Sequence, residues 1–509
     1  MSVTQPTEQE KVGYLIKKLR EEKGMTQEAF AQALSTSQSA VARMESGGQN
    51  LTLEQLGKIS TILGRKIVSL SSDSIDFKIE GGRQLSGTIV TNTSKNGAIN
   101  MICASLVNRG KTILHGMPRI EEVYRYIEII ESMGVVVRWL DQSTIEITPP
   151  KQLDIKAINR EVAAKTRSFT FVGALIHHAD FFLFPHSGGC KMGARTTAAY
   201  RYGLETLGVT IKTTEDDYEV TSPKQFKQNQ TVALYESSDT GAIALLIAAA
   251  RIPGVTTIKF APPNYQVQDV CFLLEKMGVK IEGIGTTTLR VHGLEDINTS
   301  VEHENSEDPI EAMFFLSAAI VTKSTLTIAR VPIEFMELEL EKLKHMGLKY
   351  SLSKEYVSNN GRTRLVDLTV SPSALTALHD KLHTQPFPGL QNDNLPFFVP
   401  IATQAEGRTL VHDWTWENRA IYFTELNRLG ASVTLTDPHR AFIEGPTKLK
   451  GAQIVCPPAL RPSAIIFIAM LAAEGTSVLR NVYSISRGYA EIAERLNSIG
   501  AHIEVMRGM

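Results

Sequence analysis

The sequence predicts an α/β protein in which a small all-α domain precedes a body of six repeated strand-helix units. Residues 11–64 place apolar side chains at helical spacing, as at Val12, Leu15, Ile16 and Leu19. From Phe77 onward, a short pattern returns six times: an aliphatic residue, two mostly polar ones, a large aliphatic residue and Gly. The chain of 509 residues is far longer than one core of about 150 residues, so we expect about three domains.

The N-terminal domain is predicted to consist of short helices. Gly24 ends the first helix and Thr26 caps the next. The three helices that follow the first are expected at 27–34, 37–46 and 52–63. A polar stretch at 71–76 is typical of a linker.

The six repeats recur at a spacing of roughly 70 residues, which is too regular for chance. Each copy closes an amphipathic helix with a C-cap glycine, and a β-prone run follows. The six glycines are Gly134, Gly208, Gly278, Gly347, Gly430 and Gly500.

The repeats divide the body into two domains of three units, with a boundary near 293–302. The chain is expected to cross back near its end, which gives domains at 77–97 with 298–509 and at 98–297, after a first domain at 1–70. Helix N-termini in such a bundle can converge on one anion-binding site.

Composition excludes several function classes. Lys and Arg number 53 against 54 acidic residues, so no global charge directs the protein to nucleic acid or a membrane. Four distant cysteines show neither zinc-ligand nor disulfide-framework spacing. No signal peptide or membrane-spanning run is seen. We expect a soluble cytoplasmic protein without a metal or cofactor.

Cys190 lies in the segment SGGCKMGAR, where Lys191 and Arg195 flank it at short distance. Positive neighbours favour the thiolate, and glycines allow the backbone to approach a ligand closely. The residues alone leave two interpretations open, a reactive thiol and an inert loop cysteine.

Residues 15–64 resemble the phage-repressor type of helix-turn-helix. The resemblance implies that the helix beginning near Ser37 enters the DNA major groove, with Gln38, Ser39 and Arg43 toward bases or phosphates and Gln27 on the backbone. A protein-docking domain is the alternative. The small excess of basic residues implies weak binding by one copy and a dimer for DNA binding.

From Phe77 to Arg507 the chain resembles the enolpyruvyl transferases, in particular those that act on UDP-N-acetylglucosamine. The motifs that carry the resemblance are FKIEGGRQLSGTIVTNTSKNGAI, SGGCKMGAR, WENR, ALRPSA and ISRGYAEIAERLNSIGA. The resemblance implies an inside-out α/β barrel in each of two domains. It also implies transfer of enolpyruvate from phosphoenolpyruvate to the 3-hydroxyl of UDP-N-acetylglucosamine with release of phosphate, the first committed step toward peptidoglycan.

The same resemblance assigns site residues. Lys95, Arg195, Arg461 and Arg487 match the cations for phosphoenolpyruvate, whose phosphate and carboxylate need several positive groups. Cys190 matches the proton donor to the methylene carbon on a closing loop, and Asp393 the carboxylate that takes the sugar proton, where a helix cap is the alternative. The matches for holding the nucleotide sugar or shaping the cleft are Asn96, Arg167, Asp239, Thr240, Gly241, Asp393 and Arg419.

The chain departs from the family at three places. Ala459 stands where an aspartate precedes the arginine by two residues, and Ala459 cannot exchange a proton. Thr196, Ala198 and Tyr200 replace the residues that approach uracil, and Ser187 replaces a proline. These departures motivate a second hypothesis, a DNA-binding regulator whose body senses a nucleotide sugar. A third, the shikimate-pathway sibling enzyme, lacks the cysteine loop in this form.

Overall fold

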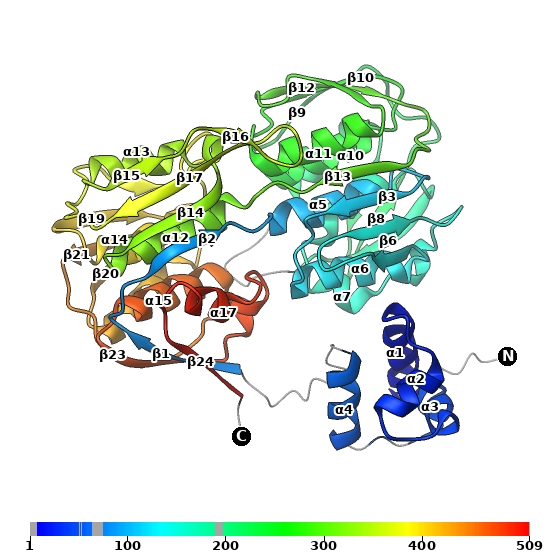
Figure 1. The fold of residues 1–509 in the computed structure, drawn as a ribbon. Helices are drawn as coiled ribbons and strands as arrows, with labels where there is room; N and C mark the ends of the chain where they lie inside the picture. Colours follow the sequence, from blue (N-terminus) through cyan, green and yellow to red (C-terminus); the bar gives the residue numbers. More distant parts are fainter. Residues whose placement is uncertain (1–7, 50, 52, 64–74, 189–196, 508–509) are drawn as a thin grey trace. The chain divides into compact units, whose positions relative to one another are not determined.

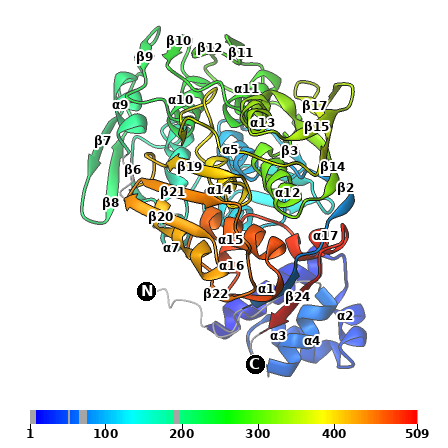
Figure 2. The same cartoon turned by 90° about the vertical axis from the view of Figure 1, so that its left-hand side faces the viewer.

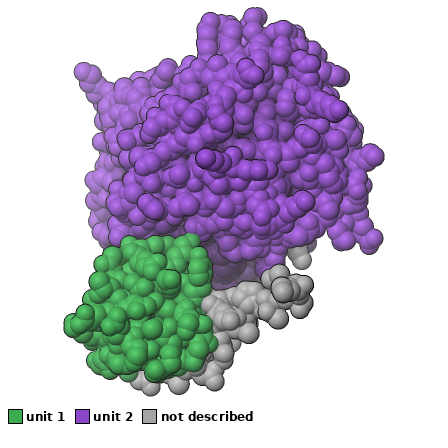
Figure 3. Space-filling view, turned by 90° about the vertical axis from the view of Figure 1, so that its right-hand side faces the viewer, with its two compact units in different colours: residues 1–74, 507–509 green, residues 75–506 purple. Residues whose placement is uncertain are grey.

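The computed structural model describes residues 8–49, 51, 53–63, 75–188 and 197–507. The chain divides into two compact units, residues 1–74 with 507–509 and residues 75–506 (Figure 3). Among the described residues, no helix is both long and apolar enough to cross a bilayer.

The N-terminal unit contains the helices α1 (Glu8–Glu22), α2 (Gln27–Ala33), α3 (Gln38–Glu45) and α4 (Leu53–Leu63). The cap predicted at Thr26 is confirmed, because its side chain accepts from the amide of Ala29 at the start of α2. Ser37 accepts in the same way from the amide of Ala40. Phe30, Val41 and Ile59 are fully buried, so the short helices share a core of their own.

The second unit begins with β1 at Ile75, so the expected linker at 71–76 ends at least two residues early. Residues 71–74 lie outside the described part of the chain. The described strands of this unit form small sheets. They are β1 (Ile75–Gly81), β2 (Ser86–Val90), β3 (Thr112–His115), β4 (Val136–Trp139), β5 (Ile145–Thr148), β6 (Phe181–Pro185), β7 (Thr210–Thr213), β8 (Asp217–Thr221), β9 (Thr231–Ala233), β10 (Gly254–Lys259), β11 (Lys280–Glu282), β12 (Thr288–Gly293), β13 (Val301–Glu304), β14 (Thr325–Pro332), β15 (Lys349–Leu352), β16 (Tyr356–Val357), β17 (Arg364–Ser371), β18 (Leu382–His383), β19 (Gly407–His412), β20 (Ser432–Asp437), β21 (Arg440–Gly445), β22 (Gln453–Val455), β23 (Gly475–Arg480) and β24 (Ile503–Arg507).

The sheets fall into two lobes. Lobe 1 has the strand orders β13-β3-β5-β4, β6-β8-β7 and β11-β12-β10-β9, and lobe 2 has β15-β17-β14-β2, β18-β19-β21-β20 and β22-β23-β1-β24. In most of these sheets, two strands pair in parallel and one of the two also pairs antiparallel with a further strand. In one example, β13 pairs in parallel with β3 while β3 pairs antiparallel with β5. Among the residues that the structure describes, five of the six sheets contain such a parallel pair.

Each lobe surrounds apolar helices with its sheets (Figure 2). These inner helices are α5 (Lys95–Ser105), η2 (Ser168–Phe171) with α8 (Val172–Leu175), and α10 (Asp239–Ala249) in lobe 1, and α12 (Pro309–Val321), η4 (Leu395–Phe397) with α14 (Phe398–Ala402), and α15 (Leu460–Ala472) in lobe 2. A helix such as α10, with apolar residues around most of its circumference, is stable only when it is buried on all sides. The predicted inside-out barrels are therefore confirmed.

Each repeat also contains a second helix, which ends just before the repeat glycine. These helices are α6 (Glu121–Ser132), α9 (Ala198–Thr206), α11 (Tyr265–Lys276), α13 (Glu337–His345), η5 (Ala420–Leu429) and α17 (Ile492–Asn497). The remaining short helices are η1 (Ile155–Ala157), α7 (Arg160–Ala164), η3 (Ile333–Phe335) and α16 (Tyr483–Ser486). All six repeat glycines have positive φ, between 89° and 104°. This left-handed conformation favours glycine, which explains why the residue recurs at each helix end.

Two connections join the lobes, one from β2 to α5 and one from β13 to α12 (Figure 1). They are held to each other, because the amide of Ser94 donates to the carbonyl of Ser306 at 2.7 Å and the amide of Asp308 donates to that of Asn92 at 2.8 Å. Ser94 also caps α5 by accepting from the amide of Gly97. The first residue of α5, Lys95, therefore lies directly beside the junction of the lobes.

Candidate active site

A cluster of charged side chains, most of them buried, lies at this junction, and the side chain of Asp393 within it is 32% exposed. The carboxylate of Asp393, in the loop before η4, has its Oδ1 3.4 Å from Nε of Arg461 and 4.0 Å from Nη1 of Arg419. Burial alone would raise the pKa of Asp393, but Arg461, Arg419, Arg167 and Lys95 together lower it to about 2. Asp393 is therefore ionised at neutral pH and pairs with arginines instead of capping a helix.

The arginines around Asp393 are held by further contacts. Arg461, the second residue of α15, donates from Nη1 to the hydroxyl of Tyr489 at 2.8 Å. Arg419 is completely buried and makes a bidentate pair with Asp413, at 2.5 and 2.8 Å. Its Nη1 faces Asp393 without a hydrogen bond. Arg419 therefore acts on Asp393 from a completely buried position.

A second carboxylate, Glu122 at the start of α6, lies among the other cations. Its Oε2 accepts from Nη2 of Arg487 at 2.9 Å and lies 4.0 Å from Nζ of Lys95. Burial opposes ionisation, but Lys95, Arg167 and Arg487 lower the pKa of Glu122 to about 2. Lys95 itself is desolvated, and burial lowers its pKa.

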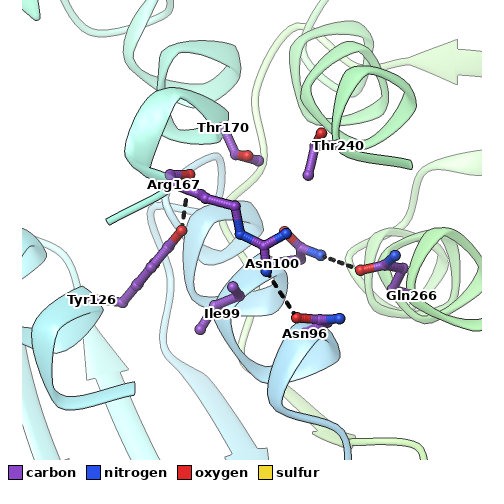
Figure 4. Close-up of a pocket in the computed structure, with 8 residues that line it drawn as sticks. All are labelled: Asn96, Ile99, Asn100, Tyr126, Arg167, Thr170, Thr240 and Gln266. Atoms are coloured by element: carbon purple, nitrogen blue, oxygen red, sulfur yellow. Dashed lines mark hydrogen bonds between the residues drawn. The ribbon is translucent and has the colours of Figure 1, made fainter. Parts of the chain in front are cut away.

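A small pocket lined mainly by polar residues opens beside the cluster. Figure 4 shows Arg167 donating to the side chain of Asn96 at 3.0 Å and Asn100 facing Gln266 at 3.4 Å. The hydroxyl of Tyr126 fixes the backbone of Arg167 at 2.9 Å. The lining residues are Asn96, Ile99, Asn100, Tyr126, Arg167, Thr170, Thr240 and Gln266. Amide, hydroxyl and guanidinium groups suit a ligand with hydroxyls and anionic oxygens.

Asp239, the first residue of α10, lies behind this pocket. Its Oδ2 accepts from Asn264 at 2.9 Å and from Gln266 at 2.5 Å. Burial raises the pKa of Asp239 to about 6, although the two amides oppose the rise. The carboxyl therefore changes charge near neutral pH, directly beside a residue that lines the pocket.

The structure brings most of the predicted site residues into this one region. They are Lys95, Asn96, Arg167, Asp239, Thr240, Asp393, Arg419, Arg461 and Arg487. Gly241 is next to Thr240, and its amide is used by the Ser238 cap. Cys190 and Arg195 lie outside the described residues, so their roles stay predictions.

Sequence reasoning assigned no role in the site to Glu122, Asn264, Gln266 or Tyr489, although Tyr489 lies within the quoted motif ISRGYAEIAERLNSIGA. For Glu122 the one available signal was its place in the first turn of an amphipathic helix, where acidic residues are common for purely local reasons. Its packing against cations from elsewhere in the chain could not be read from that position.

Comparison with known proteins decides the family. The family model for EPSP synthase (3-phosphoshikimate 1-carboxyvinyltransferase) matches residues 79–496. The chain is 32% identical over 438 residues to the UDP-N-acetylglucosamine 1-carboxyvinyltransferase of Bradyrhizobium diazoefficiens, which covers 84% of this chain and 98% of that one. The chain belongs to the enolpyruvyl transferase family. A second enzyme of the same name, from Treponema denticola, is 31% identical over 431 residues and covers 84% of this chain and 99% of its own.

Solved structures agree with the transferase fold. The enolpyruvyl transferase NikO from Streptomyces tendae matches with a TM-score of 0.71 at 20% identity, over 86% of this chain and 100% of that one. EPSP synthase from Acinetobacter baumannii matches with a TM-score of 0.65 at 18% identity, over 85% of this chain and 100% of its own.

The N-terminal unit of this transferase matches a helix-turn-helix family model over residues 16–70. Gln38, Ser39 and Arg43 are exposed on α3, where a DNA-reading helix presents its side chains. Gln27 is half-buried and donates to the carboxylate of Glu45 at 2.8 Å, so its side chain is already engaged.

Two departures from the family have a visible structural setting. Ala459 is buried at the N-cap position of α15, which has no side-chain cap. Tyr200, on α9, packs its ring edge-to-face on Phe169 with centroids 5.1 Å apart. The tyrosine therefore contributes to the packing of lobe 1 close to Arg167.

Proposed function

We propose that the protein transfers enolpyruvate from phosphoenolpyruvate to the 3-hydroxyl of UDP-N-acetylglucosamine and releases phosphate, as its resemblance to the UDP-N-acetylglucosamine 1-carboxyvinyltransferases implies. One observation carries the proposal. Among the described residues, four cations from both lobes, Lys95, Arg419, Arg461 and Arg487, share three carboxylates within 4.0 Å, Glu122, Asp393 and Asp413, and a pocket lined mainly by polar residues adjoins them. The phosphate and carboxylate of phosphoenolpyruvate are groups that such cations bind.

In this proposal, one set of residues binds phosphoenolpyruvate and another set binds the nucleotide sugar. Lys95, Arg461 and Arg487, together with Arg195, take the phosphate and carboxylate of phosphoenolpyruvate. Arginine suits both groups because its guanidinium donates two parallel hydrogen bonds. Asn96, Arg167, Asp239, Thr240 and Gly241 take the nucleotide sugar, for which the pocket offers amide and hydroxyl groups.

Asp393 acts as the general base in the proposed reaction. With a pKa of about 2 it is a weak base while its arginine neighbours are unneutralised. Binding of phosphoenolpyruvate places negative charge on Arg461, which raises the proton affinity of Asp393 when the donor is in place. The sugar oxygen then attacks C2 of phosphoenolpyruvate, its proton passes to Asp393, and Cys190 gives a proton to C3. Loss of a C3 proton and of phosphate restores the enol double bond.

The test is phosphate release from phosphoenolpyruvate by the purified chain, with and without UDP-N-acetylglucosamine. We expect release only with both substrates, and its loss in Cys190→Ala. Cys456→Ala is the matched control, because Cys456 is a buried thiol whose pKa burial raises to about 11. A wild-type rate of zero with both substrates would remove the proposal.

A second candidate function is regulation of transcription by the N-terminal unit. The helix-turn-helix match and the exposed side chains of α3 favour it. We propose that a dimer of the chain binds two DNA half-sites, since one copy has few cations for phosphate contacts. Binding of the full chain to random-sequence DNA should weaken steeply between about 50 and 200 mM salt. Salt-independent or absent binding would leave protein docking as the role of this unit.

We also propose that the protein works in the cytoplasm. The cysteines Cys103, Cys271 and Cys456 are free and buried, which suits a reducing compartment. Fractionation of cells that express the tagged chain tests this, and recovery in the membrane pellet would contradict it.

A further inference from the structure

Glu122 ties together two elements that belong to different lobes. It is the second residue of α6, whose apolar face packs into the core of lobe 1, whereas Arg487 directly follows α16 in lobe 2. Its side chain is only 5% exposed. One turn later on α6, Arg125 donates to the hydroxyl of Tyr483 at the start of α16. The two helices are therefore joined at two points, one ionic and one between a guanidinium and a phenol.

The two cations that contact Glu122, Arg487 and Lys95, are residues that we propose bind phosphoenolpyruvate. A carboxylate within 2.9 Å of Arg487 and 4.0 Å of Lys95 fixes the separation of the two positive groups. Two neighbouring buried cations without such a carboxylate would repel, which would drive Arg487 toward solvent and Lys95 toward loss of its proton. The contacts of Glu122 therefore affect the position and charge of Lys95 and Arg487, in addition to connecting the two lobes.

We propose that Glu122 is a positioning residue of the transferase that holds Lys95 and Arg487 together as one anion-binding pair for phosphoenolpyruvate. It does not itself contact the substrate. The inference rests on the proposed function, because it assigns Glu122 a role toward the donor substrate of that reaction.

The charge on Lys95 makes the inference testable. Burial lowers the pKa of Lys95, and Arg167 and Arg461 lower it further, whereas Glu122 and Asp393 raise it. The charged and titratable groups that face Lys95 come from several elements: Glu122, Arg167, Asp308, Asp393 and Arg461. Removing the charge of Glu122 lowers the pKa of Lys95 again, so Lys95 loses its proton at a lower pH. Affinity for an anion then falls on the alkaline side.

The experiment measures kcat and KM for phosphoenolpyruvate against pH in Glu122→Gln. Glutamine keeps the shape and the hydrogen-bond acceptor but not the charge. We expect KM to rise about tenfold or more at neutral pH, since a charge-assisted contact is lost. We also expect the alkaline limb of kcat/KM to move to lower pH, and Glu122→Asp to restore much of both.

Two controls separate positioning from a structural tie. Arg125→Met breaks the other contact between α6 and α16 and should leave the alkaline limb where it is in the wild type. Glu128→Gln removes an exposed charge from the same helix and should change neither parameter. Thermal unfolding of each variant shows whether it is folded, and Glu122→Asp keeps the test informative if Glu122→Gln is not.

The outcomes are distinct. An unmoved alkaline limb and an unchanged KM in folded Glu122→Gln would overturn the inference, as would the same limb shift in Arg125→Met. A wild-type chain that releases no phosphate with both substrates would instead count against the proposed function.

Discussion

Two buried charge clusters in this chain differ in a way that separates structure from function. In the N-terminal unit, Arg20 makes a bidentate pair with Glu45 at 2.5 and 3.1 Å and donates to the carbonyl of Met25, while Gln27 occupies the same carboxylate. Nη2 of Arg20 also donates to the exposed carboxylate of Glu21 at 3.3 Å, so all three guanidinium nitrogens have a partner. At the lobe junction, four described cations, Lys95, Arg419, Arg461 and Arg487, share three carboxylates within 4.0 Å, and Nη1 of Arg419 has no hydrogen bond. Burial of charge is common to both clusters, and the unbalanced one is the cluster that we propose binds the substrate.

The largest expected effect comes from Asp393→Asn, which removes the base and increases the imbalance. We expect kcat to fall about 100-fold to 10,000-fold, the usual contribution of a general base. Asp437→Asn is the control, since Asp437 is a paired carboxylate at a distant turn in lobe 2. Steady-state phosphate release measures both. Loss of less than tenfold in Asp393→Asn would mean that another group takes the proton.

Breaking the balanced cluster should affect stability and leave catalysis intact. Glu45→Gln leaves Arg20 buried without its counter-charge, which typically costs about 3 to 5 kcal/mol of unfolding free energy. We expect the N-terminal unit to unfold at lower temperature while the transferase rate stays at the wild-type value. Replacing both partners, as Arg20→Met with Glu45→Leu, should restore much of the stability. A lowered rate in Glu45→Gln would show that the two units are coupled.

We expect the pH dependence of KM for the nucleotide sugar to arise from Asp239 at the pocket and not from the general base Asp393. Burial raises the pKa of Asp239 to about 6, so the carboxyl is neutral below that pH and ionised above it. Because the ionised form faces an anionic nucleotide, KM for the nucleotide sugar should rise as pH increases through about 6. Asp239→Asn should abolish the change and raise the unfolding free energy at pH 7, where the wild type carries a buried charge.

Asp308→Asn is the matched control for that experiment. Burial also raises the pKa of Asp308 to about 6, and asparagine keeps its N-cap on α12. If this variant removed the pH dependence of KM and Asp239→Asn did not, the assignment to Asp239 would be wrong.

A smaller effect is expected when a carboxylate is added to the unbalanced cluster. Ala459→Asp places an acceptor at the uncapped start of α15, two residues before Arg461. A cap of this kind contributes about 1 kcal/mol to stability. If the absent carboxylate limits proton transfer, kcat rises several-fold. Ala459→Asn supplies the cap without the charge, and an equal gain in both variants would assign the effect to helix stability alone.

The sequence predicted the architecture well because the repeat glycines and the cap at Thr26 act locally. A helix end or a cap depends on a few neighbouring residues, and those are visible in order along the chain. Lys95, Asp393 and Arg461 could be predicted because they lie in motifs that the family shares. Glu122 could not, since only the packing of α6 against Arg487 distinguishes it from Glu121 beside it. The engagement of Gln27 by Glu45 is likewise a contact between distant positions.

The central claim is that the unbalanced cluster binds phosphoenolpyruvate for transfer to a nucleotide sugar. The most direct measurement incubates the purified chain with both substrates, detects enolpyruvyl-UDP-N-acetylglucosamine by mass spectrometry and quantifies phosphate in the same sample. We predict one phosphate for each enolpyruvyl group transferred, and loss of both products in Arg461→Met. Absence of the enolpyruvyl product from the wild-type chain, or its undiminished formation by Arg461→Met, would contradict the claim.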